Sequence, residues 1–298
     1  MRTENSLIWE SHHPPQGSRQ WIDAEGKACY PYAMSSQTVT SRLTLRKIQE
    51  RHARGEKLTM LTAYDCVTAA LLDQSGIEMI LVGDSLGNVV LGYDTTIPVT
   101  MDDMIRHAAA VVRGTQHAFV ICDLPFGTTL DPDTALKASI RAFQETGCQA
   151  VKLEGGAQVA PIVRRLVESG IPVVSHIGLT PQFIHQLGGY YRHGKSEDGA
   201  QLLGDAAHAL QEAGASAIVL ECIVPEVATR ITAQLKIPTI GIGSGDGCSG
   251  QVLVINDLIG LGVRPAPSFA RPRADVASVI RKAAQEYIEA VRAGTSTG

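Results

Sequence analysis

Four short apolar runs of this 298-residue chain each end on a carboxylate. The acids that follow these runs, in chain order, are Asp84, Asp123, Glu154 and Glu221. Burying a carboxylate without a partner costs free energy. Four such acids in similar positions therefore suggest that they serve one common functional site. In parallel α/β proteins, the carboxyl ends of the strands meet at one mouth. The sequence therefore predicts that these acids converge on a single site.

Asp84 and Asp123, with Glu154 behind them, are the candidate metal ligands. They offer only oxygen atoms, and no cysteine or histidine pair has the spacing of a zinc site. Oxygen donors favour Mg²⁺, which binds few protein carboxylates and fills its other positions with water or substrate. A 2-oxo acid would chelate such an ion through its keto oxygen and one carboxylate oxygen. The alternative interpretation is that each acid caps a helix or pairs with a lysine.

Lys152 is the candidate cation of the site. It precedes Glu154 by two residues, so on a strand both side chains point to the same face. A cation beside the acids would stabilise an enolate or bind a substrate carboxylate. A purely structural ion pair is the alternative.

Glu221 and His176 are the candidates for proton transfer. Apolar residues follow Glu221, and such surroundings raise a carboxyl pKa and favour a general base. The alternative is that Glu221 caps the helix predicted to begin near Pro225. His176 ends a fifth apolar run, and a histidine at a strand end serves either catalysis or hydrogen bonding alone.

Alternating strand-like and helix-like segments must position these side chains from residue 41 onward. Seven continuous apolar runs are predicted strands, near 58–63, 79–82, 118–122, 149–153, 172–175, 216–220 and 238–242. An eighth lies within 251–259, where the strand and helix patterns are ambiguous. Continuous apolar runs are typical of strands that are buried on both faces. The pattern predicts one (β/α)₈ TIM barrel over 41–293, with a doubly wound sheet as the alternative.

Residues 1–40 lack any strand or helix periodicity. We interpret them as a flexible or loosely attached N-terminal extension. The adjacent His12 and His13 lie in a polar context that is typical of a tail rather than of a metal site. Met34 precedes a plausible helix start, which leads to the hypothesis that translation begins there.

Composition restricts the class of protein. The net charge of −4 and the pI of about 6.1 argue against nucleic-acid binding. No apolar stretch approaches the length of a membrane span, and the N-terminus lacks an apolar signal core. The six cysteines form no Cys-x-x-Cys pair, which is typical of reduced thiols in a cytoplasmic protein. Residues 245–250 match G-x-G-x-x-G but open no first βαβ unit, so they predict no dinucleotide site.

Taken in order, these residues resemble the ketopantoate hydroxymethyltransferase family. The matching segments are Thr62–Asp65, Val82–Gly87, Pro98–Thr100, Asp123–Phe126, Val151–Gly156, His176–Gln182, Gly188–Tyr190, Leu220–Cys222 and Gly241–Gly243. They extend over about residues 41–272, and so many ordered motifs are far more specific than any one of them.

The resemblance implies a barrel of the phosphoenolpyruvate mutase/isocitrate lyase-like type and an Mg²⁺-dependent enzyme. The implied reaction transfers a hydroxymethyl group from 5,10-methylenetetrahydrofolate to 3-methyl-2-oxobutanoate. It gives 2-dehydropantoate in the biosynthesis of pantothenate and coenzyme A. The resemblance also implies a homo-oligomer, commonly a decamer.

The same resemblance assigns roles to individual residues. Asp84, Asp123 and Glu154 would surround the metal, and Asp84, Ser85, Asp123 and Lys152 would contact the oxo acid. Glu221 would be the proton acceptor, and His176 would line the pocket.

Two sites depart from the family pattern. Ser249 stands where many members carry an aspartate, and Tyr191–His193 replaces a commoner lysine-valine-glutamine. We expect both departures to affect folate contacts or the closure of residues 188–199, which are the predicted lid.

Two rival functions fit the sequence less well. A carbon–carbon lyase on a related barrel usually carries a lysine-cysteine-glycine-histidine motif, which is absent from the sequence. A non-catalytic metabolite-binding barrel would not need every candidate metal and base residue.

Overall fold

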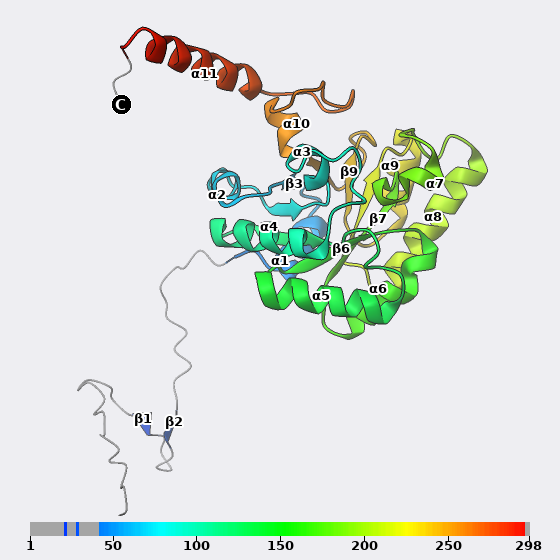
Figure 1. The fold of residues 1–298 in the computed structure, drawn as a ribbon. Helices are drawn as coiled ribbons and strands as arrows, with labels where there is room; N and C mark the ends of the chain where they lie inside the picture. The colour runs from blue at the N-terminus through cyan, green and yellow to red at the C-terminus, as the bar shows by residue number, and fades with distance from the viewer. Residues whose placement is uncertain (1–20, 23–27, 30–41, 296–298) are drawn as a thin grey trace, which may run out of the picture. The chain divides into compact units, whose positions relative to one another are not determined.

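The computed structural model describes residues 21–22, 28–29 and 42–295 (Figure 1). The predicted extension 1–40 therefore lies almost wholly outside the described residues, as do His12, His13 and Met34. The part of it that is described is a two-stranded antiparallel pair of β1 (Trp21–Ile22) and β2 (Ala28–Cys29).

Eight parallel strands close into a barrel. Their order around it is β10-β3-β4-β5-β6-β7-β8-β9. Their bounds are β3 Leu58–Thr62, β4 Met79–Val82, β5 Phe119–Asp123, β6 Ala150–Glu154, β7 Val173–Gly178, β8 Ala217–Glu221, β9 Thr239–Ile242 and β10 Gly250–Leu253. Because β10 pairs with both β9 and β3, the sheet has no edge. The predicted (β/α)₈ barrel is confirmed, and the doubly wound alternative is wrong.

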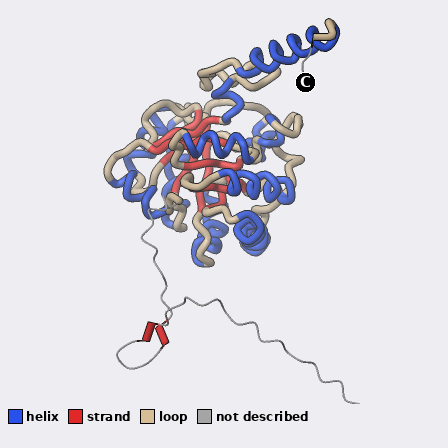
Figure 2. The backbone as a smooth tube through the Cα atoms, turned by 90° about the vertical axis from the view of Figure 1, so that its left-hand side faces the viewer, coloured by secondary structure: helices blue, strands red, loops and turns tan. Residues whose placement is uncertain are grey.

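Helices surround the strands, as Figure 2 shows in blue around red. The helices within the described residues are α1 Leu45–Ala53, α2 Cys66–Gln74, α3 Leu86–Val89, α4 Met101–Gly114, α5 Pro132–Thr146, α6 Ala160–Glu168, α7 Ile184–Leu187, α8 Glu197–Glu212, α9 Pro225–Gln234, α10 Ile255–Ile259 and α11 Val276–Arg292, with the 3₁₀ turns η1 Ala157–Val159 and η2 Pro181–Phe183. The last of them, α11, has no buried residue and is not part of this layer. Local sequence sets several of these ends. The side chains and backbones of Thr100 and Asp103 bond each other in a capping box that begins α4. Within the described residues, no helix is long and apolar enough to cross a membrane.

Two apolar layers make the core. One layer fills the space between strands and helices, and the other fills the barrel interior with residues such as Ile121 and Val219. Side chains alternate along a strand, so the residue two places later faces the same way. Asp123 follows Ile121 at this spacing, and Glu221 follows Val219. The interior core thus gives way to acids at the carboxyl ends of the strands.

The ambiguous segment near residue 255 contains both element types. β10 ends at Leu253, and α10 begins at Ile255 after one connecting residue. A Cβ on Gly250 would lie 2.4 Å from the carbonyl oxygen of Leu58, so close pairing with β3 requires glycine there.

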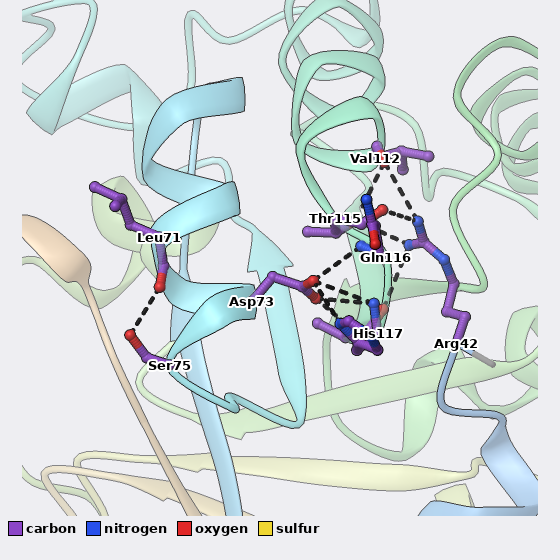
Figure 3. A network of polar contacts seen from close by, with 9 residues as sticks. Arg42, Leu71, Asp73, Ser75, Val112, Thr115, Gln116 and His117 are labelled. Atoms are coloured by element: carbon purple, nitrogen blue, oxygen red, sulfur yellow. Dashed lines mark hydrogen bonds and ion pairs between the residues drawn. The ribbon is translucent and has the colours of Figure 1, made fainter. Parts of the chain in front are cut away.

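A buried carboxylate joins α2 to the segment before β5 (Figure 3). Asp73 accepts hydrogen bonds from the backbone N–H groups of Gln116, His117 and Ala118, at 3.0, 3.0 and 2.7 Å. Arg42 bonds the same segment from the other side, through the hydroxyl of Thr115 at 2.9 Å. These contacts lie at the amino-terminal end of β5, opposite the acids at the strand ends.

Candidate active site

The seven side chains predicted for the site lie together. A cavity of about 460 Å³ opens at the carboxyl ends of the strands, and its walls include Asp84, Ser85, Asp123, Lys152, Glu154, His176 and Glu221. This volume is in the range of small-molecule sites. The convergence predicted from the strand-end pattern is therefore present in the fold.

Asp84, Asp123 and Lys152 form the most buried part of the site. Lys152 Nζ donates to Asp123 Oδ2 at 2.7 Å, and the backbone N–H of Asp84 reaches the same oxygen at 3.3 Å. The three residues are 4, 1 and 4 % exposed, so their charges interact with little screening by water. Because Asp84 follows β4 directly and β4 pairs with β5, the two aspartates come from adjacent strands.

Burial and mutual repulsion govern these charges. Burial, and then the charges of Asp123 and Glu154, hold the pKa of Asp84 well above its usual range. Burial also raises the pKa of Asp123, although Lys152 opposes that shift. Burial lowers the pKa of Lys152, but the surrounding carboxylates outweigh it and raise the pKa overall. Lys152 is therefore a permanent cation in a site with an excess of acids.

His176 lies between two glutamates. Its Nδ1 is 3.3 Å from Glu154 Oε1, and its Nε2 is 3.2 Å from Glu221 Oε2. Burial and Lys152 lower the pKa of His176, but Glu154 and Glu221 outweigh them and raise it to about 9. Burial raises the pKa of Glu154, yet contact with His176 holds it below its usual range. His176 thus lies within ion-pair distance of both glutamates, without hydrogen-bond geometry to any described residue.

Glu221 lies at the end of β8 and lines the cavity. Its surroundings are only partly apolar, because His176 touches its carboxylate. The helix that follows, α9, begins at Pro225 without any side-chain cap, so the cap interpretation of Glu221 is wrong. The next residue, Cys222, has φ of 50°, a conformation that a side chain of this kind rarely adopts. This strained turn sits directly after the candidate base.

Gln182 is a site residue that the sequence analysis left without a role. Its backbone N–H donates to Glu154 at 3.1 Å, and its side-chain amide donates to Asp84 at 2.9 Å. The same amide group also bonds the carbonyl of Leu124 at 3.0 Å. Gln182 lies in η2, immediately after the strand that carries His176. The sequence analysis identified site residues by their charge, and Gln182 is neutral and lies outside the strands. Its position after Pro181, close to the end of the strand that carries His176, is the local feature that could have indicated it.

Ser85 is oriented by a buried tyrosine. The hydroxyls of Ser85 and Tyr64 lie 2.8 Å apart, and burial raises the pKa of Tyr64. The tyrosine therefore stays neutral and able to donate. Ser85 lines the cavity beside Asp84.

The chemistry of the donor set fits a hard cation. One oxygen of Asp123, Oδ1, is buried and has no hydrogen-bond partner among the described residues. A cation beside Asp84 would also relieve the repulsion that raises its pKa. Across the described part of the chain, no group of three or more histidine, cysteine, aspartate or glutamate side chains is arranged as a metal site. The three-acid ligand set thus stays a prediction, and two aspartates match the way Mg²⁺ binds few protein carboxylates.

The predicted lid segment, 188–199, contributes Tyr190 to the cavity wall. Tyr190 is 62 % exposed, so it stands at the rim rather than in the core. The segment begins at Gly188, which ends α7 with φ of 75°. The backbone of His193 bonds Cys222 and Val224, so the segment is joined to the residues that follow Glu221. The last residues of the segment form the first turn of α8, which begins at Glu197.

The two departures from the family pattern lie in different places. Ser249 lies next to the first residues of two strands: its carbonyl accepts from Leu58, and its backbone N–H donates to Thr239 at 3.2 Å. It is therefore at the amino-terminal end of the barrel, and the expectation that it affects folate contacts or lid closure is wrong. Tyr191 and His193 stack with ring centroids 4.7 Å apart and line a neighbouring groove.

Comparison with known proteins is consistent with this site. The sequence model of the ketopantoate hydroxymethyltransferase family matches residues 42–296. A 3-methyl-2-oxobutanoate hydroxymethyltransferase of Chloroflexus aurantiacus is 53 % identical over 257 residues, which are 86 % of this chain and 91 % of that protein. One from Syntrophus aciditrophicus is 50 % identical over 263 residues, covering 88 % and 97 %.

Solved structures share the barrel at low sequence identity. A phosphonopyruvate hydrolase solved with oxalate and Mg²⁺ aligns with a TM-score of 0.58 at 12 % identity, covering 85 % of this chain and 88 % of that one. A 2,3-dimethylmalate lyase, a member of the PEP mutase/isocitrate lyase superfamily, aligns with a TM-score of 0.57 at 15 % identity, covering 86 % and 90 %. At such identities the likeness concerns the fold, and it agrees with the predicted barrel type.

Proposed function

The chain belongs to the ketopantoate hydroxymethyltransferase family, and on this basis we propose its full reaction. A hydroxymethyl group passes from 5,10-methylenetetrahydrofolate to 3-methyl-2-oxobutanoate, and 2-dehydropantoate is formed on the way to pantothenate. The protein is a cytoplasmic, Mg²⁺-dependent transferase. The single observation that carries the proposal is the convergence of Asp84, Asp123, Lys152, His176 and Glu221 on one cavity.

Asp84 and Asp123 would hold the Mg²⁺ ion, with Glu154 facing it from the next strand. When bound, the ion supplies Lewis-acid polarisation of the keto oxygen and makes the neighbouring C3–H more acidic. Lys152 places its ammonium beside Asp123, where it holds the substrate carboxylate or the negative charge that develops on the enolate. Ser85 and Asp84 orient the oxo acid.

Glu221 removes the C3 proton in this proposal. Its carboxylate lines the cavity, and His176 Nε2 lies 3.2 Å from its Oε2. Since His176 also contacts Glu154, the imidazolium fixes Glu221 relative to the acidic cluster. A C–C bond then forms between C3 and the one-carbon unit, while the two C–N bonds that join this unit to the folate break. One water supplies the hydroxyl oxygen and protonates the two nitrogens, so tetrahydrofolate leaves, and the proton taken by Glu221 returns to the new alkoxide.

The methylene carbon must be shielded from water while the enolate forms. Tyr190 at the cavity rim and the glycines on either side of it make residues 188–199 the candidate lid. Its backbone link to Cys222 couples lid position to the turn that carries Glu221.

We also propose that the protein is a homo-oligomer, with a decamer as the specific expectation. Support comes from α11, which has no buried residue yet carries several exposed apolar side chains, Val279, Ile280, Tyr287, Ile288 and Val291. An apolar stripe of this kind is typical of a surface that another copy covers.

The test is a product assay with the purified full-length chain. The protein is incubated with the oxo acid, 5,10-methylenetetrahydrofolate and Mg²⁺, and the product mass is read. We expect a species heavier than the oxo acid by one CH₂O unit. Absence of this species, with deuterium exchange at C3 still present, would mean that the chain makes the enolate but uses another electrophile.

A further inference from the structure

Asp257 is a carboxylate in the cavity that the proposed mechanism does not use. It lies in α10, directly after β10, and lines the same cavity as Asp84 and Lys152. Its side chain makes no hydrogen bond or ion pair with any described residue, although burial raises its pKa. A half-buried carboxylate without a partner costs free energy unless a ligand supplies the donors.

The surroundings of Asp257 differ from those of Asp84, Asp123 and Glu154. The charge of Asp257 is felt at Tyr64, whose hydroxyl touches Ser85, whereas no charge of the Lys152 cluster acts on Asp257. The cavity wall near it contains Val254, Pro267 and Phe269. A flat, apolar wall with one carboxylate suits an aromatic ring that carries N–H donors on one edge.

A second pocket continues from this point. Asn88, Val89 and Asp257 line both the inner cavity and an outer pocket of about 720 Å³. Arg264 and Arg281 line the outer pocket. The two spaces together offer a path for a long ligand with a ring at its inner end and an anionic group at its outer end.

We infer that Asp257 recognises the pterin ring of the tetrahydrofolate donor, whose anionic tail leaves through the outer pocket. The ring presents N3–H and a 2-amino group side by side, and one carboxylate accepts from both. The oxo acid is itself an anion and belongs with Lys152 rather than with an unpaired carboxylate. This inference rests on the proposed function, because it assigns Asp257 to the folate donor of the proposed reaction.

The experiment compares Asp257→Asn with the wild-type chain. Asparagine keeps the size of the side chain but loses the negative charge and one acceptor. Binding of tetrahydrofolate and of 6-methyltetrahydropterin, which lacks the tail, is measured by titration calorimetry. In parallel, deuterium uptake at C3 of 3-methyl-2-oxobutanoate is followed with Mg²⁺ and without folate. Asp205→Asn, an exposed carboxylate on α8, is the matched control.

We expect Asp257→Asn to weaken both ligands by about tenfold or more, as for loss of a charge-assisted pair. C3 exchange should stay within twofold of wild type, which also shows that the variant is folded. Unchanged tetrahydrofolate affinity would overturn the inference, as would loss of C3 exchange, which would place Asp257 with the oxo acid. Weaker binding of tetrahydrofolate alone would assign Asp257 to the tail and overturn it too. A wild-type chain that binds no tetrahydrofolate would instead refute the proposed donor.

Discussion

The buried charges of the site are unequal in number. Asp84, Asp123, Glu154 and Glu221 face two cations, Lys152 and His176. Burial raises the pKa of Asp84, and the neighbouring charges of Asp123 and Glu154 raise it further. A divalent cation would supply the missing charge, and the predictions at this scale depend on that balance.

Glu221→Gln tests the proton acceptor. We expect Mg²⁺ and oxo-acid binding to persist, because the variant leaves Asp84, Asp123 and Lys152 in place. Deuterium uptake at C3 should fall by about 10²–10⁴-fold, the usual contribution of a general base. Proton NMR of the substrate in deuterated water measures it. Glu226→Gln, an exposed glutamate in the first turn of α9, is the control and should exchange normally. Normal exchange in Glu221→Gln would remove the base assignment.

Asp84→Ala tests the metal ligand. Metal-dependent binding of the oxo acid should weaken by about tenfold or more, since even outer-shell partners of a metal contribute that much. Titration calorimetry with and without Mg²⁺ separates the metal-dependent part. Asp246→Ala, exposed in the loop after β9, serves as the control. If both variants bind the oxo acid as tightly as wild type, Asp84 holds no metal.

At the scale of elements, Asp123 and Glu221 are each aimed by the residue two places before them on the strand. Ile121 and Val219 fix β5 and β8 in the interior core, and the pleat then aims Asp123 and Glu221 into the cavity. Contacts at the opposite end hold the strands in register, and Asp73 supplies the most connected of these.

Asp73→Ala should destabilise the barrel without touching the site. Three backbone N–H groups lose their acceptor, and we expect the free energy of unfolding to fall by about 2–3 kcal/mol. Urea unfolding followed by circular dichroism measures it. Asp133→Ala, on the surface of α5, is the control and should change stability by less than about 0.5 kcal/mol. C3 exchange should stay normal in both variants.

The effect of Asp73 should depend on pH in a defined direction. Burial raises its pKa, but the hydrogen bonds from Ala118, Gln116 and His117 outweigh burial and hold it below its usual range. A lowered folded-state pKa adds stability above the unfolded value of about 3.9, and that stability is lost as pH falls through the folded value. The stability difference between wild type and Asp73→Ala should therefore be constant near neutral pH and narrow below about pH 4. A difference that widens there would contradict this account.

At the scale of the whole molecule, α11 is the exposed feature. A helix is stabilised mainly by packing its apolar face, and α11 has no buried residue within this chain. We therefore expect another subunit to cover its apolar side chains. Tyr287→Glu combined with Val291→Glu should lower the molar mass measured by light scattering after size exclusion. Lys282→Ala, whose side chain forms an exposed i,i+4 pair with Glu286, is the control and should leave the mass unchanged. An unchanged mass in the double variant would place the subunit interface elsewhere.

Local sequence determined the elements and the charged residues at their ends. Apolar runs that end on Asp84, Asp123, Glu154 and Glu221 predict both strands and acids, because the period of a strand is fixed by backbone geometry alone. The segment near residue 255 was ambiguous, since a short strand and a short helix follow each other there.

Tertiary structure alone decided which residues meet across the barrel. Closure of β10 onto β3 places Asp257 in the cavity and Ser249 at the opposite end, although only seven residues lie between them in sequence. Likewise, the contacts of Gln182 with Asp84 and of His176 with Glu221 join segments far apart in the chain. Sequence spacing encodes which face a side chain takes, whereas a contact between distant strands exists only once the sheet has closed.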